Sequence, residues 1–471
     1  MLIQDPKQRI ELWNRLLRHN AEKKLFESFQ EAPPIEVADF LVQQSSRVGL
    51  HLFSLLPKET QGMVFSHFTE DYQHHVYRKL PRRVLGGIFV HMASDERVDF
   101  YQKLSEKEQA KLLPYLPKKV KQDILELCAY PVETAGGIMS TDFATVEENM
   151  IVAEALKRLR EDAPSRKMMY YLYVVDEEMQ MKGILSLKDL VLEDSKTKIS
   201  DILQDNYVFI EVDEDKESVA RKIEKYDLVA LPVLNEEKQI VGIVSYDDAM
   251  DIIRAEQTED MERFMGIESI DQELDYLQTS SVQHFRKRVG WIVGLFIASS
   301  LSAIVMHSYE NSLQSVLKSL LLYFPVINDA GGNTGSQTAT VVIRALSLGN
   351  VTVKDWLRIL FKELRVALLF VLCLFLLAFL KVIFFSGPWG KLLFKGSAHE
   401  SLPGGLFLFA FVVSLSLSLQ VIVSTAIGAG LPLFIKWRGG DPALAASPMI
   451  TTCVDVTGLF IYFTIASLLL L

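Results

Sequence analysis

The spacing of hydrophobic residues along the chain changes abruptly near residue 289. Before this point, apolar residues recur at short intervals among charged ones, as in KETQGMVFSHF over residues 58–68. After it, long runs are almost wholly apolar, such as VALLFVLCLFLLAFL over residues 366–380. A helix needs about 20 apolar residues to cross the hydrocarbon core of a bilayer. The pattern therefore predicts a large water-soluble N-terminal part followed by an α-helical membrane domain.

The apolar half of the chain divides into five predicted spans, at residues 289–308, 315–346, 364–385, 404–435 and 447–471. Basic segments lie before the first span (FRKR), between the second and third (KDWLRILFKELR) and between the fourth and fifth (KWRGGD). Lys and Arg near span ends favour the cytosolic side of a membrane. We therefore expect a multi-pass protein of the cell (plasma) membrane, with its N-terminal half in the cytoplasm and its C-terminus outside.

The soluble part begins with a repeat of short helices over residues 1–130. Helix-start signals, either a proline or a Ser/Thr cap, recur every 11 to 13 residues, at Pro57, Thr69, Pro81, Ser94, Ser105 and Pro117. Single helices this short cannot bury an apolar face alone, so stacking is expected. The pattern predicts an all-α helical-repeat domain; an irregular helical domain is the alternative.

Residues 131–253 contain a second repeat of a different kind. LYVVDEEMQMKGILSLKDL (172–190) matches LPVLNEEKQIVGIVSYDDA (231–249) at a constant offset of 59, with nine identities. Each copy predicts a strand, a turn at Glu-Glu, a second strand and a helix that starts at Ser-x-x-Asp. Upstream, Ile138-Met139 matches Ile202-Leu203. The region is therefore predicted to be an α/β pair of modules.

Carboxylates dominate the segment that follows. Eleven of them lie between Asp247 and Asp275, against two arginines. Such a run repels itself unless cations lie among the charges, so the pattern predicts a long acidic helix over residues 247–285 that attracts cations. The net charge of −10 likewise suits cations better than nucleic acid. The three cysteines are scattered and form no disulfide or zinc pattern.

The second predicted span contains a polar, glycine-rich stretch, NDAGGNTGSQT over residues 328–338, just after Pro325. We expect the proline to break the helix there, because backbone without internal hydrogen bonds is tolerated in a membrane only against protein or a wet cavity. Close helix packing explains the glycines. It does not explain the neutral oxygen donors, which suit a hydrated cation: Asn333, Thr334, Gln337 and Thr338.

Asp455 is the other exceptional membrane residue. It lies inside the apolar fifth span, SPMITTCVDVTGLFIYFTIASLLLL, which holds no basic residue. A carboxylate at such a position is costly and marks a functional site by default. A cation is the expected partner, and a protonated, hydrogen-bonded Asp455 is the alternative.

These residues resemble the MgtE family of magnesium channels over nearly the whole chain. The resemblance rests on YPVETAGGIM, the tandem repeat of CBS (cystathionine β-synthase) modules, PVINDAGGNTGSQTATVVIRALSLG and GGDPALAASPMITTCVDVTGLFIYF. It implies four parts: a helical-repeat domain (1–130), tandem CBS domains (131–253), an acidic connecting or "plug" helix (254–285) and a five-span membrane domain (286–471).

The resemblance also implies a homodimer whose pore follows the two-fold axis. Asp455 then lines the pore with the backbone carbonyl of Thr451, and Asn333 lies beside it. Asp329 departs from the family pattern; it either adds a second acidic ring or faces a lysine, and we count it among the pore residues.

Regulatory and nucleotide sites follow from the same resemblance. DERVDF over residues 95–100 matches a family motif that binds regulatory metal through Asp95 and Asp99. Further regulatory Mg²⁺ ligands are predicted at Asp247, Asp251, Glu256, Glu259, Asp260 and Asp441. The CBS modules imply ATP as a cofactor beside Mg²⁺, on Ser186, Asp189, Ser245 and Asp248, although the same residues also form ordinary helix caps.

The predicted function is Mg²⁺ influx through a channel that cytosolic Mg²⁺ closes. The alternatives are a cation-coupled carrier of divalent metals and a CBS-based membrane sensor that transports nothing. An enzyme is not expected, because no nucleophile–base constellation or GxxxxGK[ST] phosphate loop occurs in the sequence.

Overall fold

The structure is a computed structural model that describes residues 5–19, 21–161, 170–268, 279–314, 316–386 and 405–471. The chain forms two compact units, Met1–Glu256 and Gln257–Leu471, and each is described by itself.

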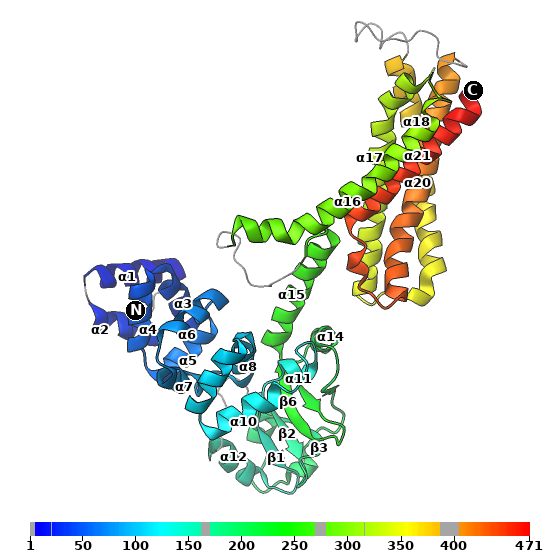
Figure 1. Ribbon diagram of the computed structural model, residues 1–471. Coiled ribbons are helices and arrows are strands. Elements are labelled where there is room, and N and C mark those ends of the chain that lie inside the picture. The colour runs from blue at the N-terminus through cyan, green and yellow to red at the C-terminus, as the bar shows by residue number, and fades with distance from the viewer. Residues whose placement is uncertain (1–4, 20, 162–169, 269–278, 315, 387–404) are drawn as a thin grey trace. The chain divides into compact units, whose positions relative to one another are not determined.

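The first unit begins with ten short helices, coloured blue to cyan in Figure 1. They are α1 (Pro6–Arg18), α2 (Glu22–Gln30), α3 (Pro34–Gln43), α4 (Ser46–Leu55), α5 (Lys58–Ser66), α6 (Glu70–Lys79), α7 (Arg82–Phe89), α8 (Ser94–Lys103), α9 (Glu106–Leu112) and α10 (Lys118–Leu127). Every predicted helix start is confirmed: each signal residue is the first residue of a helix or directly precedes it. Aromatic side chains fill the shared core, as where the Trp13 and Phe29 rings meet edge to face at 5.0 Å.

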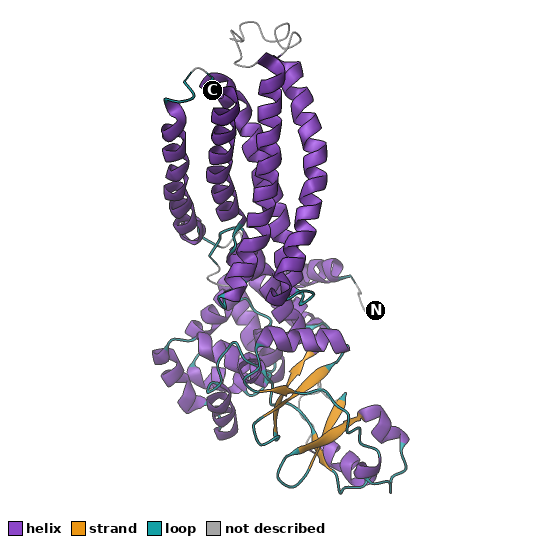
Figure 2. Cartoon of the chain, turned by 90° about the vertical axis from the view of Figure 1, so that its right-hand side faces the viewer, coloured by secondary structure: helices purple, strands orange, loops and turns teal. Residues whose placement is uncertain are grey.

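Two small sheets follow, shown as orange arrows in Figure 2. Their strands are β1 (Thr145–Glu147), β2 (Tyr171–Val175), β3 (Met181–Ser186), β4 (Ile210–Glu211), β5 (Ala230–Leu234) and β6 (Ile240–Ser245). The strand orders are β1-β2-β3 and β4-β5-β6, each with one parallel and one antiparallel pairing. The helices are α11 (Ala135–Ile138), α12 (Val152–Glu161), α13 (Leu187–Leu192) and α14 (Lys216–Tyr226). The predicted strand–turn–strand–helix repeat is confirmed.

The two copies of the repeat exchange their leading segments. Ser140, upstream of the first copy, pairs with Ile243 on β6, while Gln204, upstream of the second, pairs with Ile184 on β3. A glycine in each second strand makes room for this exchange. A Cβ added at Gly242 would lie 2.5 Å from the sulfur of Met139, and the equivalent Cβ at residue 183 would meet a leucine.

The acidic helix is shorter than predicted. Helix α15 spans Tyr246–Phe264, and the chain then turns at Gly266, whose φ of +69° is a left-handed conformation that glycine adopts without strain. The next helix begins only at Ser281. A single helix over residues 247–285 is therefore wrong, and the predicted carboxylates at 271, 273 and 275 lie outside the described residues.

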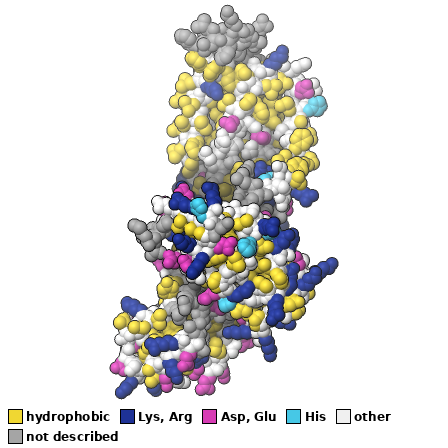
Figure 3. All heavy atoms as spheres, turned by 90° about the vertical axis from the view of Figure 1, so that its left-hand side faces the viewer, with side chains coloured by type: hydrophobic (Ala, Val, Ile, Leu, Met, Phe, Trp, Pro, Cys, Tyr) yellow, Lys and Arg dark blue, Asp and Glu magenta, His cyan; other side chains and the backbone are white. Residues whose placement is uncertain are grey.

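Long helices make up most of the second unit. They are α16 (Ser281–Glu310), α17 (Leu317–Ser347), α18 (Trp356–Ser386), α20 (Gly405–Trp437) and α21 (Ser447–Leu470). Figure 3 shows hydrophobic side chains gathered on the surface of this bundle. Within the described residues, four helices are long and apolar enough to span a membrane: α16, α18 together with the turn before it, α20 and α21. Helix α17 falls short because of its polar stretch, so the count of five spans stays a prediction.

Helix α17 continues through Pro325 and the glycine-rich stretch, so the expected break at the proline is wrong. Packing against two neighbouring helices explains this continuity. Gly331, Gly332 and Gly335 are buried, and a Cβ added at Gly428 of α20 would overlap the Gly335 carbonyl. Tertiary contact at this distance outweighs the low helix propensity of glycine.

This contact predicts the effect of one methyl group. We expect Gly428→Ala to push α17 and α20 apart and to destabilise the bundle by about 1–3 kcal/mol, the usual cost of overpacking. Thermal unfolding of the detergent-solubilised protein measures the change. Gly430→Ala is the matched control two residues further along α20, since its Cβ meets nothing within 4 Å. Equal melting temperatures for the two variants would contradict close packing of α17 against α20 at Gly428.

Candidate functional site

The stretch 328–338 divides its residues between two faces of α17. The glycines and Thr334 are buried towards the neighbouring helices, whereas Asp329, Asn333 and Gln337 are exposed in the single chain. These three polar residues are four apart, so they share one side of the helix. Thr334 donates to the Ala330 carbonyl of its own helix at 2.7 Å. Its hydroxyl proton is therefore bound to its own helix, and contact of its oxygen with a cation stays a prediction.

Asp455 is half-buried on α21 and has a partner that the sequence analysis missed. Asn328 Nδ2 on α17 donates to Asp455 Oδ1 at 2.6 Å. The amide oxygen of Asn328, Oδ1, is buried and accepts no hydrogen bond from the described residues. Asn328 opens the polar stretch, but its partner lies 127 residues away, so sequence spacing alone does not identify it.

Gln420 on α20 is a second unpredicted polar residue near Asp455. It is fully buried, and its Nε2 donates to the backbone carbonyl of Val454 at 2.7 Å. Two glycines make room for it: a Cβ at Gly331 or Gly458 would lie 2.8 or 2.7 Å from Gln420 Nε2. Gln420 thus holds α21 at the residue directly before Asp455. The sequence offers one sign of this role: Gln420 is a lone amide side chain within a predicted span.

Thr451 lies one turn before Asp455 on α21, as expected. Its hydroxyl donates to the Ser447 carbonyl at 3.0 Å, and its methyl group would contact a Cβ at Gly332 at 3.3 Å. The structure thus brings α17 against α21 beside Asp455. The exposed Asn333 and Asp329 lie on α17, and no described contact joins them to Asp455.

In the first unit, α8 packs against the CBS pair at a group of carboxylates. Ser94 Oγ lies 2.8 Å from Ser140 Oγ, and the Ser94 N–H donates to Asp142 Oδ2 at 2.9 Å. Burial, together with the neighbouring charge of Asp248, raises the pKa of Asp95 to about 8. Burial likewise raises the pKa of Asp248 to about 6. Two carboxyl groups therefore face each other where α8 meets the start of α15, and charging both of them is unfavourable.

The other predicted regulatory ligands do not complete a metal site with this pair among the described residues. Asp99, Asp247 and Asp251 are exposed. In the described part of the chain, no three His, Cys, Asp or Glu side chains lie close enough to hold a metal ion. The regulatory metal sites therefore remain predictions.

Arg263 engages two more of the predicted regulatory carboxylates. Arg263 forms ion pairs with Glu259 on its own helix and with Asp441 in the loop between α20 and α21, the latter at 2.6 Å. Asp441 also caps the short turn Pro442–Leu444 through the Ala443 N–H, at 2.9 Å. Arg263 thus ties the end of α15 to the loop that precedes the Asp455 helix. Asp260 is half-buried on the same helix.

Glu256 lies one helical turn before Glu259 and pairs with Lys216 of α14 at 3.3 Å. Lys216 also pairs with Glu133, at 2.7 Å. A cationic side chain therefore already stands beside this predicted metal ligand.

The Ser-x-x-Asp pairs act as helix caps in both CBS copies. Ser186 Oγ donates to Asp189 Oδ2 at 2.6 Å and accepts from the Asp189 N–H at 3.0 Å. Ser245 and Asp248 are hydrogen-bonded in the same way. The capping alternative is confirmed, and ATP binding at these residues stays a prediction.

These features define a membrane protein with a helical N-terminal domain, a CBS pair and a polar site inside an apolar helix bundle. Family models match each part: "divalent cation transporter" (MgtE) over residues 324–465, "MgtE intracellular N domain" over 32–133, and "CBS domain" over 135–196 and 199–255. The chain belongs to the MgtE family, and it is not an enzyme.

Named relatives support the family over most of the chain. "Magnesium transporter MgtE" of Thermus thermophilus is 38% identical over 360 residues, covering 76% of this chain and 75% of the relative. The protein of the same name from Bacillus subtilis is 32% identical over 342 residues, covering 72% and 70%. Among solved structures, the soluble part of a magnesium transporter matches with a TM-score of 0.51 and 30% identity, over 54% of this chain and 99% of that one.

The Asp95–Asp248 contact predicts that the stability of the first unit depends on pH. Because the pKa of Asp95 is higher in the folded chain than in the unfolded chain, the folded state binds more protons between about pH 4 and pH 8. The contribution of this contact to the free energy of unfolding therefore falls as pH rises through that range. We expect Asp95→Asn to slow amide hydrogen exchange in α8 and the first turns of α15 at pH 8 with EDTA, and to have little effect near pH 4.

Asp213→Asn, an exposed site in a turn, is the control for loss of one carboxylate. Exchange at pH 8 that is unchanged by Asp95→Asn would show that the two carboxylates do not repel each other.

Proposed function

We propose that this protein is a Mg²⁺ channel that works as a homodimer, carries Mg²⁺ into the cell down its electrochemical gradient and is closed by cytosolic Mg²⁺. Support comes first from the family: relatives named magnesium transporters match about three-quarters of the chain. The observation that carries the proposal is Asp455, a carboxylate on an apolar helix, with Asn328 bonded to one of its oxygens.

The chemistry of this pair suits a hydrated divalent ion. Mg²⁺ gives up its water shell reluctantly, so a protein passage should hold it through waters rather than strip it. The Asp455 carboxylate supplies charge, and Asn328 Oδ1 is a buried acceptor for a water proton. A monovalent ion would gain about half the electrostatic attraction at the same carboxylate.

The exposed face of α17 supports a two-chain pore. Asp329, Asn333 and Gln337 form a polar stripe on a helix whose surroundings are otherwise apolar. Polar groups facing lipid are costly, whereas the same stripe facing its copy would border a wet path. In that arrangement Asp329 adds the second acidic ring, and Asp455 meets its counterpart. The five spans and the outside C-terminus belong to this proposal.

Regulation follows from carboxyl groups that are costly to charge together without metal. Asp95 and Asp248 face each other in the first unit, and Mg²⁺ bound between or beside them would replace the Asp95 proton, offset both negative charges and favour the compact state. Arg263 holds the end of α15 to the loop before α21 in the second unit. Metal bound at the regulatory carboxylates thus stabilises one arrangement of α15, the proposed closed one. ATP in the CBS pair would bias the same equilibrium.

Transport is tested with Asp455→Asn, which removes the charge and keeps the size. In proteoliposomes under a Mg²⁺ gradient, we expect uptake to fall at least tenfold. Glu310→Gln, an exposed carboxylate at the end of α16, is the control and should retain wild-type uptake. Equal uptake by Asp455→Asn and wild type would remove the pore assignment, and a strict need for a proton or sodium gradient would favour a carrier. No Mg²⁺ uptake by the wild type would favour the sensor.

Closure is tested with Arg263→Gln. Loss of its partly exposed ion pair with Asp441 should weaken the closed state modestly, by up to about 1 kcal/mol. The Mg²⁺ concentration on the cytosolic side that halves uptake should rise roughly two- to fivefold. Arg254→Gln is the matched control on the same helix, because Arg254 pairs with Asp251 one turn before it, at 3.4 Å. If Arg263→Gln leaves the Mg²⁺ concentration that halves uptake unchanged, the Arg263–Asp441 ion pair plays no part in gating.

A further inference from the structure

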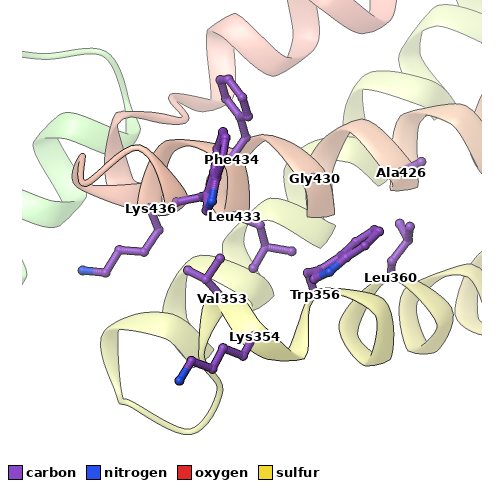
Figure 4. A pocket seen from close by; sticks show the side chains of 10 residues that line it. Val353, Lys354, Trp356, Leu360, Ala426, Gly430, Leu433, Phe434 and Lys436 are labelled. Carbon is purple, nitrogen blue, oxygen red and sulfur yellow. The ribbon is translucent and has the colours of Figure 1, made fainter.

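A cavity of about 800 Å³ lies between α18 and α20, on helices other than the α17–α21 pair that carries Asp455. Figure 4 shows its walls, with Trp356 and Leu360 on one side and Leu433 and Gly430 on the other. The volume falls within the range of about 300–1,000 Å³ found for small-molecule sites. Its walls are apolar over most of their length, so they suit a hydrocarbon chain.

One end of the cavity is basic. Lys354 and Lys436 line it, both are exposed, and in Figure 4 their amino groups point towards the same end. Neither lysine forms an ion pair with another described residue. Asp355, the neighbouring acid, is engaged elsewhere: it accepts from Thr352 Oγ1 at 2.9 Å and pairs with Arg358 at 3.6 Å.

Aromatic residues mark this end as the membrane interface. Trp356 and Trp437 line the cavity and are 50% and 65% exposed, and tryptophan is enriched at the level of lipid head groups. The apolar length of the cavity therefore extends from the interface into the hydrocarbon layer. Basic pockets of this kind between membrane helices bind anionic head groups.

We propose that this cavity binds an anionic phospholipid. The lipid phosphate lies between Lys354 and Lys436, and one acyl chain fills the groove beside Leu360 and Gly430. The two charges select against zwitterionic lipids, which carry a cationic group that the lysines repel. The site depends on the membrane location of the bundle and not on Mg²⁺ transport, so it can fail or hold independently of the proposed function.

The charge requirement is tested by native mass spectrometry of the full chain in detergent with equal amounts of phosphatidylglycerol and phosphatidylcholine. We expect wild type to retain phosphatidylglycerol preferentially, and Lys354→Gln/Lys436→Gln to lose that preference roughly tenfold. Lys318→Gln, which changes an exposed lysine in the first turn of α17, is the control for loss of a positive charge outside the cavity. Retention of phosphatidylcholine to the same extent as phosphatidylglycerol would overturn the proposal.

The shape requirement is tested separately with Gly430→Leu, which keeps both lysines. A Cβ at this position meets nothing within 4 Å, so the variant should fold while its side chain fills the groove. We expect loss of bound phosphatidylglycerol with the oligomeric mass unchanged. If both variants instead change the number of chains per particle without changing bound lipid, the surface joins two copies of the chain and the lipid site is wrong. Glycerol phosphate, added as a head group without chains, should not displace the lipid.

Discussion

A carboxylate inside an apolar bundle depends on neighbouring helices that come close enough to give it polar partners. Here glycine provides that closeness. Without a Cβ at Gly335 and Gly428, α17 and α20 meet backbone to backbone, and the spaces left by Gly331 and Gly458 admit the amide of Gln420. Asn328 then donates to the Asp455 side chain, and Gln420 donates to the backbone carbonyl of Val454. Together these hydrogen bonds hold α21 in place at Asp455. The ion chemistry proposed for this protein rests on these contacts.

Much of the soluble half could be predicted, because its signals are local. A proline or serine at the start of a short helix acts within one turn, and the 59-residue repeat aligns strands, turns and caps directly. Even the irregular features repeat: Met179 and Lys238, which are 59 residues apart, both have positive φ, of 63° and 61°. The acidic helix was predicted too long, since like charges indicate an exposed helix but give no signal for its end, which a glycine supplies at residue 266.

The candidate site could be predicted only in part, because its partners are distant in sequence. Asp455 is exceptional by itself. The roles of Asn328 and Gln420 can be seen only in the packed structure, where α17, α20 and α21 meet. The expected break at Pro325 failed for the same reason, since packing keeps α17 continuous. In the regulatory region, Asp95 was predicted as a metal ligand and Asp248 as a nucleotide contact, whereas the fold places the two side by side.

The exchanged segments of the CBS pair carry a consequence for how that region folds. Each sheet takes an edge hydrogen-bond pair from the residues that lead into the other copy: the Ser140 pairing with Ile243 completes one, and the Gln204 pairing with Ile184 completes the other. Neither copy is whole by itself, although each has the length of an independent module. The tandem should therefore unfold in a single cooperative step, and a cut between the copies would leave two fragments that each lack an edge.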